Sequence, residues 1–414
     1  MPAAQQVASP GVAAAPDGVT PSPTPTVTLD RDKVLARLAK VSRAGIGASG
    51  VAVMTDAGTL VAGRDAHEPL TPASTMKVLT TLATLDTLGA DRTFSTRVVS
   101  PAEGKLVLVG GGDPLLTDKA STSADQPASL QALAKATAAQ LAASGVKKVS
   151  LGYDATLFSG PDFSPAWKSK WRSFLSRVSP LLINEGRFND WQSDPKPALT
   201  AATAFAKRLK AAGITVTGVR AAKAPASAEP VASVDSAPLG TIIGHTLRFS
   251  DNLAAEVLAR QLALAVGDAP SFTGATSAVK SWLVAHDLWD PGMRLVDGSG
   301  LSDRSRVTPA VLAGAIATSL GTESLGAVAE GLPVAGQSGT LKDRFNDASE
   351  RVARGNVHAK TGTLTGIGGL AGYLTTADGT RVVFAELANH ARGETTAHNW
   401  LDRTAAALVG CGCS

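Results

Sequence analysis

The stretch "HEPLTPASTMKVLTTLATLDTLGA" (residues 67–90) is the most informative part of the chain, and Ser74-Thr75-Met76-Lys77 lies in its middle. Pro72 suits a first helical turn and Gly89 suits a helix end. Between them runs an apolar stripe: Met76, Leu79, Leu82, Leu85 and Leu88. The pattern predicts a helix with Ser74 near its N-terminus. Because residues three apart share a helix face at roughly 5–6 Å, Lys77 can bring its amine to the Ser74 hydroxyl.

A serine next to a lysine in this way can act as a nucleophile with its base. The hydroxyl must lose its proton, and an amine can accept it only when neutral. Burial or a second nearby cation would lower the pKa of Lys77 and favour the neutral amine. The spacing alone is weak evidence, because it also occurs at Ser144/Lys147, Ser193/Lys196 and Ser277/Lys280.

Two further motifs follow in the sequence. Ser250-Asp251-Asn252 opens a helix-like segment, and Lys360-Thr361-Gly362-Thr363 lies in a strand-like one. Taken singly, the first is an ordinary helix cap, with Ser250 or Asn252 accepting backbone N–H groups, and the second is an edge strand with a solvated lysine. The order Ser-x-x-Lys, Ser-x-Asn, Lys-Thr-Gly is much more specific, and it is typical of beta-lactamases and penicillin-binding proteins.

Helix and strand patterns at the two ends of the chain predict one shared sheet. A helix is expected at 31–43 and strands within 50–63 around a turn at Asp56-Ala57-Gly58. Near the other end, 368–387 predicts a second hairpin that turns at Asp378-Gly379, and 394–409 a closing helix. We therefore expect an α+β fold whose antiparallel sheet is built from both termini and covered by helices.

The 414 residues exceed one compact core, so two or three domains are expected. We predict a discontinuous domain of residues 29–100 and 236–414, an inserted domain of 101–235 with a helix at 199–213, and a linker-like stretch at 221–238. Residues 1–28 are rich in Pro and Ala and predict a disordered tether; they show no signal peptide, and neither end shows a membrane span. Cys411 and Cys413 are expected as exposed thiols or a minor terminal bridge.

The motifs together resemble the D-alanyl-D-alanine carboxypeptidase and endopeptidase family, the class C low-molecular-mass penicillin-binding proteins. Supporting phrases are "PASTMKVLTT" (72–81), "VGGGDPLL" (109–116), "VDGSGLS" (296–302), "SGTLKDR" (338–344) and "VHAKTGTL" (357–364). The resemblance spans about residues 31–409. It implies an extracytoplasmic enzyme of the cell envelope with a penicillin-recognising, serine transpeptidase-like or beta-lactamase-like domain that carries an inserted accessory domain.

The resemblance also implies roles for single residues. Ser74 would attack the bond between two D-alanines, and Lys77 would take its proton. Ser250 would pass a proton to the leaving amine, and Asn252 would bind the substrate amide. Lys360 would hold the terminal carboxylate and help to keep Lys77 neutral. Thr361, Gly362 and Thr363 would bind substrate, and the backbone N–H groups of Ser74 and Thr363 would form the oxyanion hole; Asp251 would be structural.

The implied partners are peptidoglycan stem peptides ending in D-Ala-D-Ala, with beta-lactams as inhibitors. The net charge of +4 is scattered and gives no case for nucleic acid, and we expect no cofactor and no metal. Two alternatives stay open, a non-catalytic wall-binding scaffold and a beta-lactamase. Class A beta-lactamases have Glu-x-x-x-Asn after Ser-Asp-Asn, and none of the four glutamates between Asn252 and Lys360 has Asn four residues on.

Overall fold

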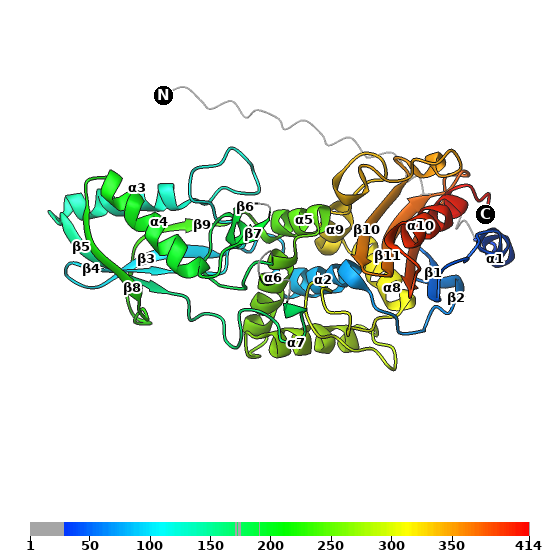
Figure 1. The fold of residues 1–414 in the computed structure, drawn as a ribbon, viewed down its shortest axis with the longest axis horizontal. Helices are drawn as coiled ribbons and strands as arrows, with labels where there is room; N and C mark the ends of the chain where they lie inside the picture. The colour runs from blue at the N-terminus through cyan, green and yellow to red at the C-terminus, as the bar shows by residue number, and fades with distance from the viewer. Residues whose placement is uncertain (1–28, 170–171, 173–174, 190, 414) are drawn as a thin grey trace, which may run out of the picture.

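The structure is a computed structural model that describes residues 29–169, 172, 175–189 and 191–413. The tether expected at 1–28 lies outside the described residues. Figure 1 shows two lobes: the strands of the two ends of the chain lie in one lobe, and the strands of its middle lie in the other. Helices α2, α5, α6 and α7 lie between the two sets of strands.

The first lobe is built on a five-stranded sheet, called here the terminal sheet, in which all neighbours are antiparallel. In spatial order its strands are β10 (Val357–Leu364), β11 (Ile367–Thr375), β12 (Arg381–Asn389), β1 (Ala48–Thr55) and β2 (Leu60–Arg64). Both expected hairpins are present, and β1 pairs with β12, so the two ends of the chain share one sheet. The predicted fold class is confirmed.

Helices cover both faces of the terminal sheet, as strand β1 shows. Because side chains alternate along a strand, Val51 and Val53 pack with α1 (Arg31–Ala39) and α10 (Glu394–Val409) on one face. Ala52 and Met54 face the other core, which contains most of the remaining helices. These are α2 (Met76–Leu88), α5 (Leu239–Phe249), α6 (Asn252–Ala265), α7 (Phe272–Ala285), α8 (Pro309–Gly321) and α9 (Gly326–Glu330).

The second lobe contains a mixed five-stranded sheet, called here the inserted sheet. Its order is β8 (Thr215–Ala221), β5 (Lys148–Asp154), β4 (Lys105–Val109), β3 (Ser95–Ala102) and β9 (Pro230–Asp235). Helices α3 (Leu130–Ala143) and α4 (Pro197–Ala211) pack on it. A short hairpin of β6 (Arg187–Asn189) and β7 (Gln192–Ser193) lies apart from it. The strands of the inserted sheet thus lie between Ser95 and Asp235, and the predicted domain limits of 101–235 stay a prediction.

Two local expectations are corrected. The stretch 221–238 is not only a linker, because β9 lies within it and pairs with β3. Strand β9 is an edge strand of the inserted sheet, and its residues are exposed or half-buried. Cys411 and Cys413 are joined in a disulfide, which is one of the two expected alternatives; the other, exposed thiols, is wrong, and both side chains are buried in the core under α10.

Short 3-10 turns complete the fold: η1 (Ala73–Thr75), η3 (Asn184–Gly186), η4 (Glu323–Leu325), η5 (Gly339–Leu341) and η6 (Arg351–Ala353). Among the described residues, no single helix has the length and apolar character to cross a membrane. One sharply bent pair, 309–321 with 323–330, meets those two criteria only when its helices are joined.

Candidate active site

Ser74 lies in the turn that enters α2, as the sequence predicts. Turn η1 contains Ser74 and runs directly into α2, which carries Lys77 on its first turn. Ala73, just before Ser74, has a left-handed backbone (φ 48°), which for a residue with a side chain costs on the order of 1–3 kcal/mol. Such a conformation persists only where surrounding contacts impose it, so the turn at Ser74 is fixed by its neighbours.

Lys77 is fully buried and lies at the centre of the site. Its Nζ donates to Ser74 Oγ (2.9 Å), to Asn252 Oδ1 (2.7 Å) and to the carbonyl oxygen of Ser299 (2.8 Å). An ammonium can donate all three hydrogen bonds. In the neutral amine, the Ser74 hydroxyl can instead donate to the nitrogen lone pair. The structure therefore brings the first two motifs together at a single amine.

The ionisation of Lys77 suits a base. Burial lowers the pKa of Lys77 to about 8, although the nearby carboxylates of Asp251, Glu256 and Asp297 oppose this effect. At pH 7 about a tenth of the molecules therefore hold Lys77 as the neutral amine. Two causes of a lowered Lys77 pKa are expected from the sequence, burial and the charge of Lys360, and burial is the main one.

The Ser250-Asp251-Asn252 motif forms the junction between two helices. Helix α5 ends at Phe249, and its C-cap Ser250 has a left-handed backbone (φ 58°). Asp251 is the N-cap of α6 and accepts from the backbone N–H groups of Leu253 and Ala254. Asp251 therefore does the capping that an ordinary interpretation gives to Ser250 or Asn252. The two flanking side chains are left to contact the lysines.

Lys360 makes the second lysine contact of the motif. It is fully buried in β10, and its Nζ donates to Ser250 Oγ and to the carbonyl oxygen of Thr361, both at 2.9 Å. Burial, followed by the positive charge of Lys77, holds the pKa of Lys360 well below its usual value. Lys77 thus joins the first motif to the second through Ser74 and Asn252, and Lys360 joins the third motif to the second through Ser250.

Strand β10 presents its backbone to the site along its outer edge. It is the edge strand of the terminal sheet, and the Ala359 N–H donates to the carbonyl of Pro333 outside that sheet. Because the direction of N–H groups alternates along a strand, those of Thr361 and Thr363 face the same outer edge. At Gly362 an added Cβ would lie 2.7 Å from the Pro72 carbonyl oxygen, so only glycine lets β10 approach the turn of Ser74 this closely.

The threonine side chains of β10 have partners that the sequence did not reveal. The hydroxyl of Thr361 shares a hydrogen bond with that of Thr340 (2.7 Å), and Thr363 Oγ1 lies 2.9 Å from His398 Nε2 on α10. The phrase "SGTLKDR" contains Thr340, but no spacing rule pairs it with Thr361. Both contacts fix side chains at the edge of the site.

A loop at 297–302 supports Lys77 from the far side, and its role was also missed. The buried carboxylate of Glu256 on α6 accepts from the backbone N–H groups of Gly298 (3.1 Å) and Ser299 (2.8 Å), and Thr80 donates to the Gly298 carbonyl oxygen. Burial, then the charge of Asp297, raises the pKa of Glu256 to about 7. These bonds hold the Ser299 carbonyl against Lys77.

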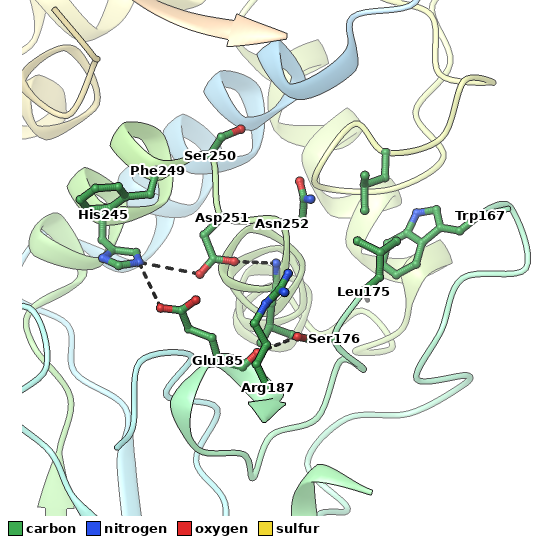
Figure 2. A pocket seen from close by; sticks show the side chains of 12 residues that line it. Trp167, Leu175, Ser176, Glu185, Arg187, His245, Phe249, Ser250, Asp251 and Asn252 are labelled. Atoms are coloured by element: carbon green, nitrogen blue, oxygen red, sulfur yellow. Dashed lines mark hydrogen bonds and ion pairs between the residues drawn. The ribbon is translucent and has the colours of Figure 1, made fainter. Parts of the chain in front are cut away.

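A pocket of about 570 Å³ opens beside the motif, and both lobes line it (Figure 2). Ser250 and Asn252 lie on one side, and Trp167, Leu175 and Arg187 come from the segment before α4. Trp167 also donates its ring N–H to the buried carboxylate of Asp297 (2.7 Å), which joins this wall to the loop at 297–302. The pocket has the room and the mixed polar lining that a peptide side chain requires.

The match to a family of known peptidases defines the class of the protein as a peptidase, a kind of hydrolase. The chain belongs to the D-Ala-D-Ala carboxypeptidase 3 (S13) family, whose model matches residues 31–196 and 190–408. The family predicted from the motifs is therefore confirmed.

Relatives and solved structures agree with this assignment. A carboxypeptidase of Mycobacterium tuberculosis is 36% identical over 355 residues, which are 84% of this chain and 76% of the relative. Carboxypeptidase DacB of Mycolicibacterium smegmatis is 33% identical over 425 residues, 98% of this chain and 90% of that protein. The crystal structure of penicillin-binding protein 4 from Haemophilus influenzae shares the fold, with a TM-score of 0.74 at 22% identity, covering 92% of this chain and 98% of that one.

Proposed function

We propose that this protein is a serine-type D-Ala-D-Ala carboxypeptidase of the cell envelope that acts on peptidoglycan stem peptides through an acyl-enzyme on Ser74. The observation that carries the proposal is the position of Lys77, whose buried amine contacts Ser74 Oγ and Asn252 Oδ1 at once. The names of the relatives support the substrate class, since one of them is a D-alanyl-D-alanine carboxypeptidase of Actinomadura, 28% identical over 423 residues.

Acylation would proceed as follows. Neutral Lys77 takes the hydroxyl proton of Ser74 while Oγ bonds to the carbonyl carbon of the first D-alanine. The N–H groups of Ser74 and Thr363 donate to the developing oxyanion, each worth on the order of 3 kcal/mol. The C–N bond then breaks, and Ser250 Oγ, which contacts Lys360, passes its proton to the departing amine of D-alanine. Ser250 takes a proton in return from the Lys77 ammonium, which leaves Lys77 neutral again. Water activated by Lys77 hydrolyses the ester and frees Ser74.

Recognition of the substrate would divide between two groups. Asn252 binds the amide of the peptide, and Lys360 with Thr361 and Thr363 holds the terminal carboxylate. That carboxylate would also counter the burial and the Lys77 charge that lower the pKa of Lys360. The same acylation step would cut a cross-link when the departing amine belongs to a second stem peptide, which gives endopeptidase activity.

The direct test is release of D-alanine from a peptide ending in D-Ala-D-Ala. We expect catalytic release with the wild-type protein, none with Ser74→Ala, and no release of L-alanine from the matched peptide ending in D-Ala-L-Ala. A folded protein that releases no D-alanine from any such peptide would favour the non-catalytic scaffold and contradict the proposal.

The acylation rate should depend on pH through Lys77. Because the base must be neutral, the rate should rise about tenfold per pH unit below the Lys77 pKa of about 8 and level off above it. An activated ester without a free carboxylate is the suitable reagent, since Lys360 then has no anion to bind. A rate that is flat between pH 6 and pH 8, or that falls, would exclude a neutral Lys77 as the base.

Lys360→Ala should impair recognition of the carboxylate selectively. A hydrogen bond to a charged group contributes roughly 1.5–3 kcal/mol, so kcat/KM for a peptide with a free C-terminal carboxylate should fall about 10-fold to 100-fold. For the same peptide with an amidated C-terminus the loss should be much smaller. Equal losses on the two peptides would show that Lys360 serves the chemistry or the fold and not the carboxylate.

A further inference from the structure

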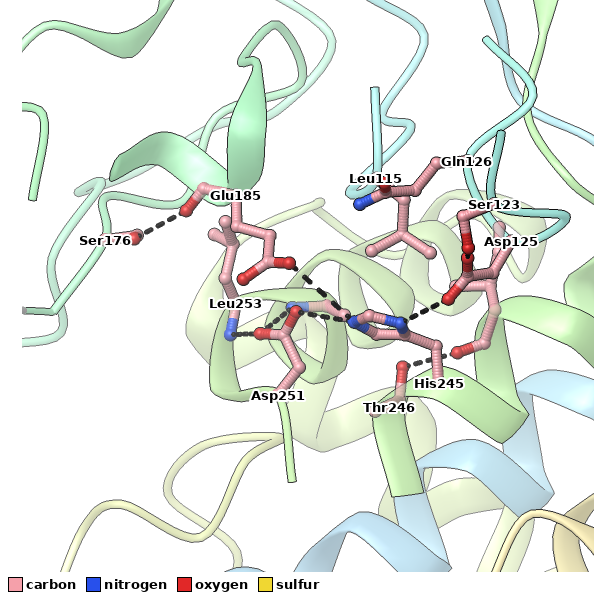
Figure 3. Close-up of polar contacts among 12 residues, drawn as sticks. Leu115, Ser123, Asp125, Gln126, Ser176, Glu185, His245, Thr246, Asp251 and Leu253 are labelled. Atoms are coloured by element: carbon pink, nitrogen blue, oxygen red, sulfur yellow. Dashed lines mark hydrogen bonds and ion pairs between the residues drawn. The ribbon is translucent and has the colours of Figure 1, made fainter. Parts of the chain in front are cut away.

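Three side chains meet at the lobe boundary beside the Ser250-Asp251-Asn252 motif, and none of them has a part in the mechanism above (Figure 3). Nε2 of His245 lies 3.9 Å from Glu185 Oε1 and 3.8 Å from Asp251 Oδ2. The three ligand-type atoms all lie within 4.8 Å of one another. The residues come from distant segments, since Glu185 belongs to η3 and His245 to α5. No sequence motif therefore predicts that they lie together.

His245 has the second carboxylate contact that is typical of a metal-binding histidine. Its Nδ1 lies 2.8 Å from Asp125 Oδ2, and donation along this bond leaves the lone pair on Nε2, toward Glu185 and Asp251. The His245 side chain is only 9% exposed, yet Nε2 has no hydrogen-bond partner among the described residues, because both carboxylates lie too far away. The imidazole nitrogen Nε2 of a largely buried side chain thus lies near two carboxylates without a hydrogen-bond partner.

Asp251 also lacks a partner on the side that faces His245. Asp251 uses Oδ1 to cap α6, and its buried Oδ2 accepts no hydrogen bond from any described residue. Two carboxylates whose oxygens lie within 4.8 Å of one another repel each other, and a cation between them would remove the repulsion.

We propose that Glu185, His245 and Asp251 bind one divalent transition-metal ion, with Zn²⁺ as the preferred ion. One imidazole and two carboxylates suit zinc, which binds such ligands at about 2.0–2.2 Å and accepts three protein ligands with an open fourth position. A tetrahedral ion at those bond lengths holds its ligand atoms roughly 3.3–3.6 Å apart, so the two His245 distances need to shorten by only a few tenths of an ångström. Glu185, whose side chain is 37% exposed, has the freedom to close the remaining gap.

An ion at this position would face the pocket and connect the two lobes. All three ligands line the pocket beside Ser250 and Asn252, so the open coordination position would face that pocket. Glu185 and Asp125 come from the segments around the inserted sheet, whereas His245 and Asp251 lie on the helices of the site. The ion would therefore join the two lobes and fix the helix junction that carries Ser250 and Asn252.

The test is metal binding to the full untagged chain, without substrate, so that it does not depend on peptidase activity. The protein is kept oxidised, so that Cys411 and Cys413 offer no thiolates. Isothermal titration with ZnCl₂ should show one ion per chain, and Co²⁺ should give the visible absorption of a four- or five-coordinate site that Zn²⁺ displaces. Glu185→Gln and His245→Gln should each weaken binding at least tenfold.

His67→Gln is the matched control, because His67 is also paired with an aspartate, Asp290, but is 63% exposed and lies outside the cluster. It should bind Zn²⁺ like the wild type. Glu185→Gln changes a partly exposed side chain, so it tests the site even if His245→Gln fails to fold. No stoichiometric binding by the wild type, or equal binding by folded Glu185→Gln, would overturn the proposal.

Discussion

Replacing Lys77 by alanine should lower the rate of acylation at Ser74 by about 10³-fold, the effect expected from loss of a positioned general base. The reason is geometric and electrostatic: among the described residues, the Lys77 amine is the only basic nitrogen with a hydrogen bond to Ser74 Oγ, and burial lowers its pKa to about 8. The measurement is the rate constant for formation of the covalent adduct with a beta-lactam or an activated ester.

Two further variants separate chemistry from folding. Lys77→Met keeps most of the buried volume but has no nitrogen, and it should lose acylation as fully as Lys77→Ala. Lys280→Ala removes the lysine of another Ser-x-x-Lys pair, one that lies on the exposed side of α7 over the ring of Trp289, and acylation should be unchanged. A folded Lys77→Met protein that acylates at the wild-type rate would contradict the assigned base.

Gly300→Ala should destabilise the protein and remove its activity together. Gly300 has φ +79°, and an added Cβ would lie 1.8 Å from the carbonyl oxygen of Ala73. The methyl group would have to displace either the turn that carries Ser74 or the loop that carries the Ser299 carbonyl. We expect a loss of about 3 kcal/mol in the free energy of unfolding, from backbone strain and overpacking together.

Gly145→Ala is the control for this experiment. Gly145 has a similar backbone (φ +71°), but an added Cβ there meets no described atom within 4 Å. Gly145→Ala should lower the free energy of unfolding by about 1 kcal/mol, the cost of backbone strain alone, and keep full activity. Chemical denaturation and the acylation rate are measured for both variants. If Gly300→Ala is no less stable than Gly145→Ala and acylates normally, the close contact between the loop and the Ser74 turn is not required.

Much of the fold can be predicted from local sequence patterns. The hairpin turns at Asp56-Ala57-Gly58 and Asp378-Gly379 and the apolar stripe of 76–88 identify the elements because turn residues and helical spacing act over short distances. The 221–238 stretch was misjudged because its residues form an edge strand through pairing with β3, a contact that composition does not record.

The candidate site likewise contains residues that sequence motifs identify and residues that only the fold brings to it. Ser74, Lys77, Ser250, Asn252 and Lys360 belong to motifs whose order can be read from the sequence. The Ser299 carbonyl and Glu256 contact the site only through tertiary packing, and the glycines of "VDGSGLS" were the single hint of a close approach there. His245 and Glu185 are sixty residues apart and meet across the lobe boundary, which no spacing rule anticipates.

The most direct test of the central claim is the intact mass of the folded protein after brief incubation with benzylpenicillin, followed by peptide mapping. We expect one persistent penicilloyl group per chain, on Ser74, and none on Ser74→Ala. The group should persist because none of the glutamates between Asn252 and Lys360 has Asn four residues on, whereas class A beta-lactamases have Glu-x-x-x-Asn after Ser-Asp-Asn. No adduct on folded protein, an adduct on another residue, or rapid steady turnover of the antibiotic would contradict it.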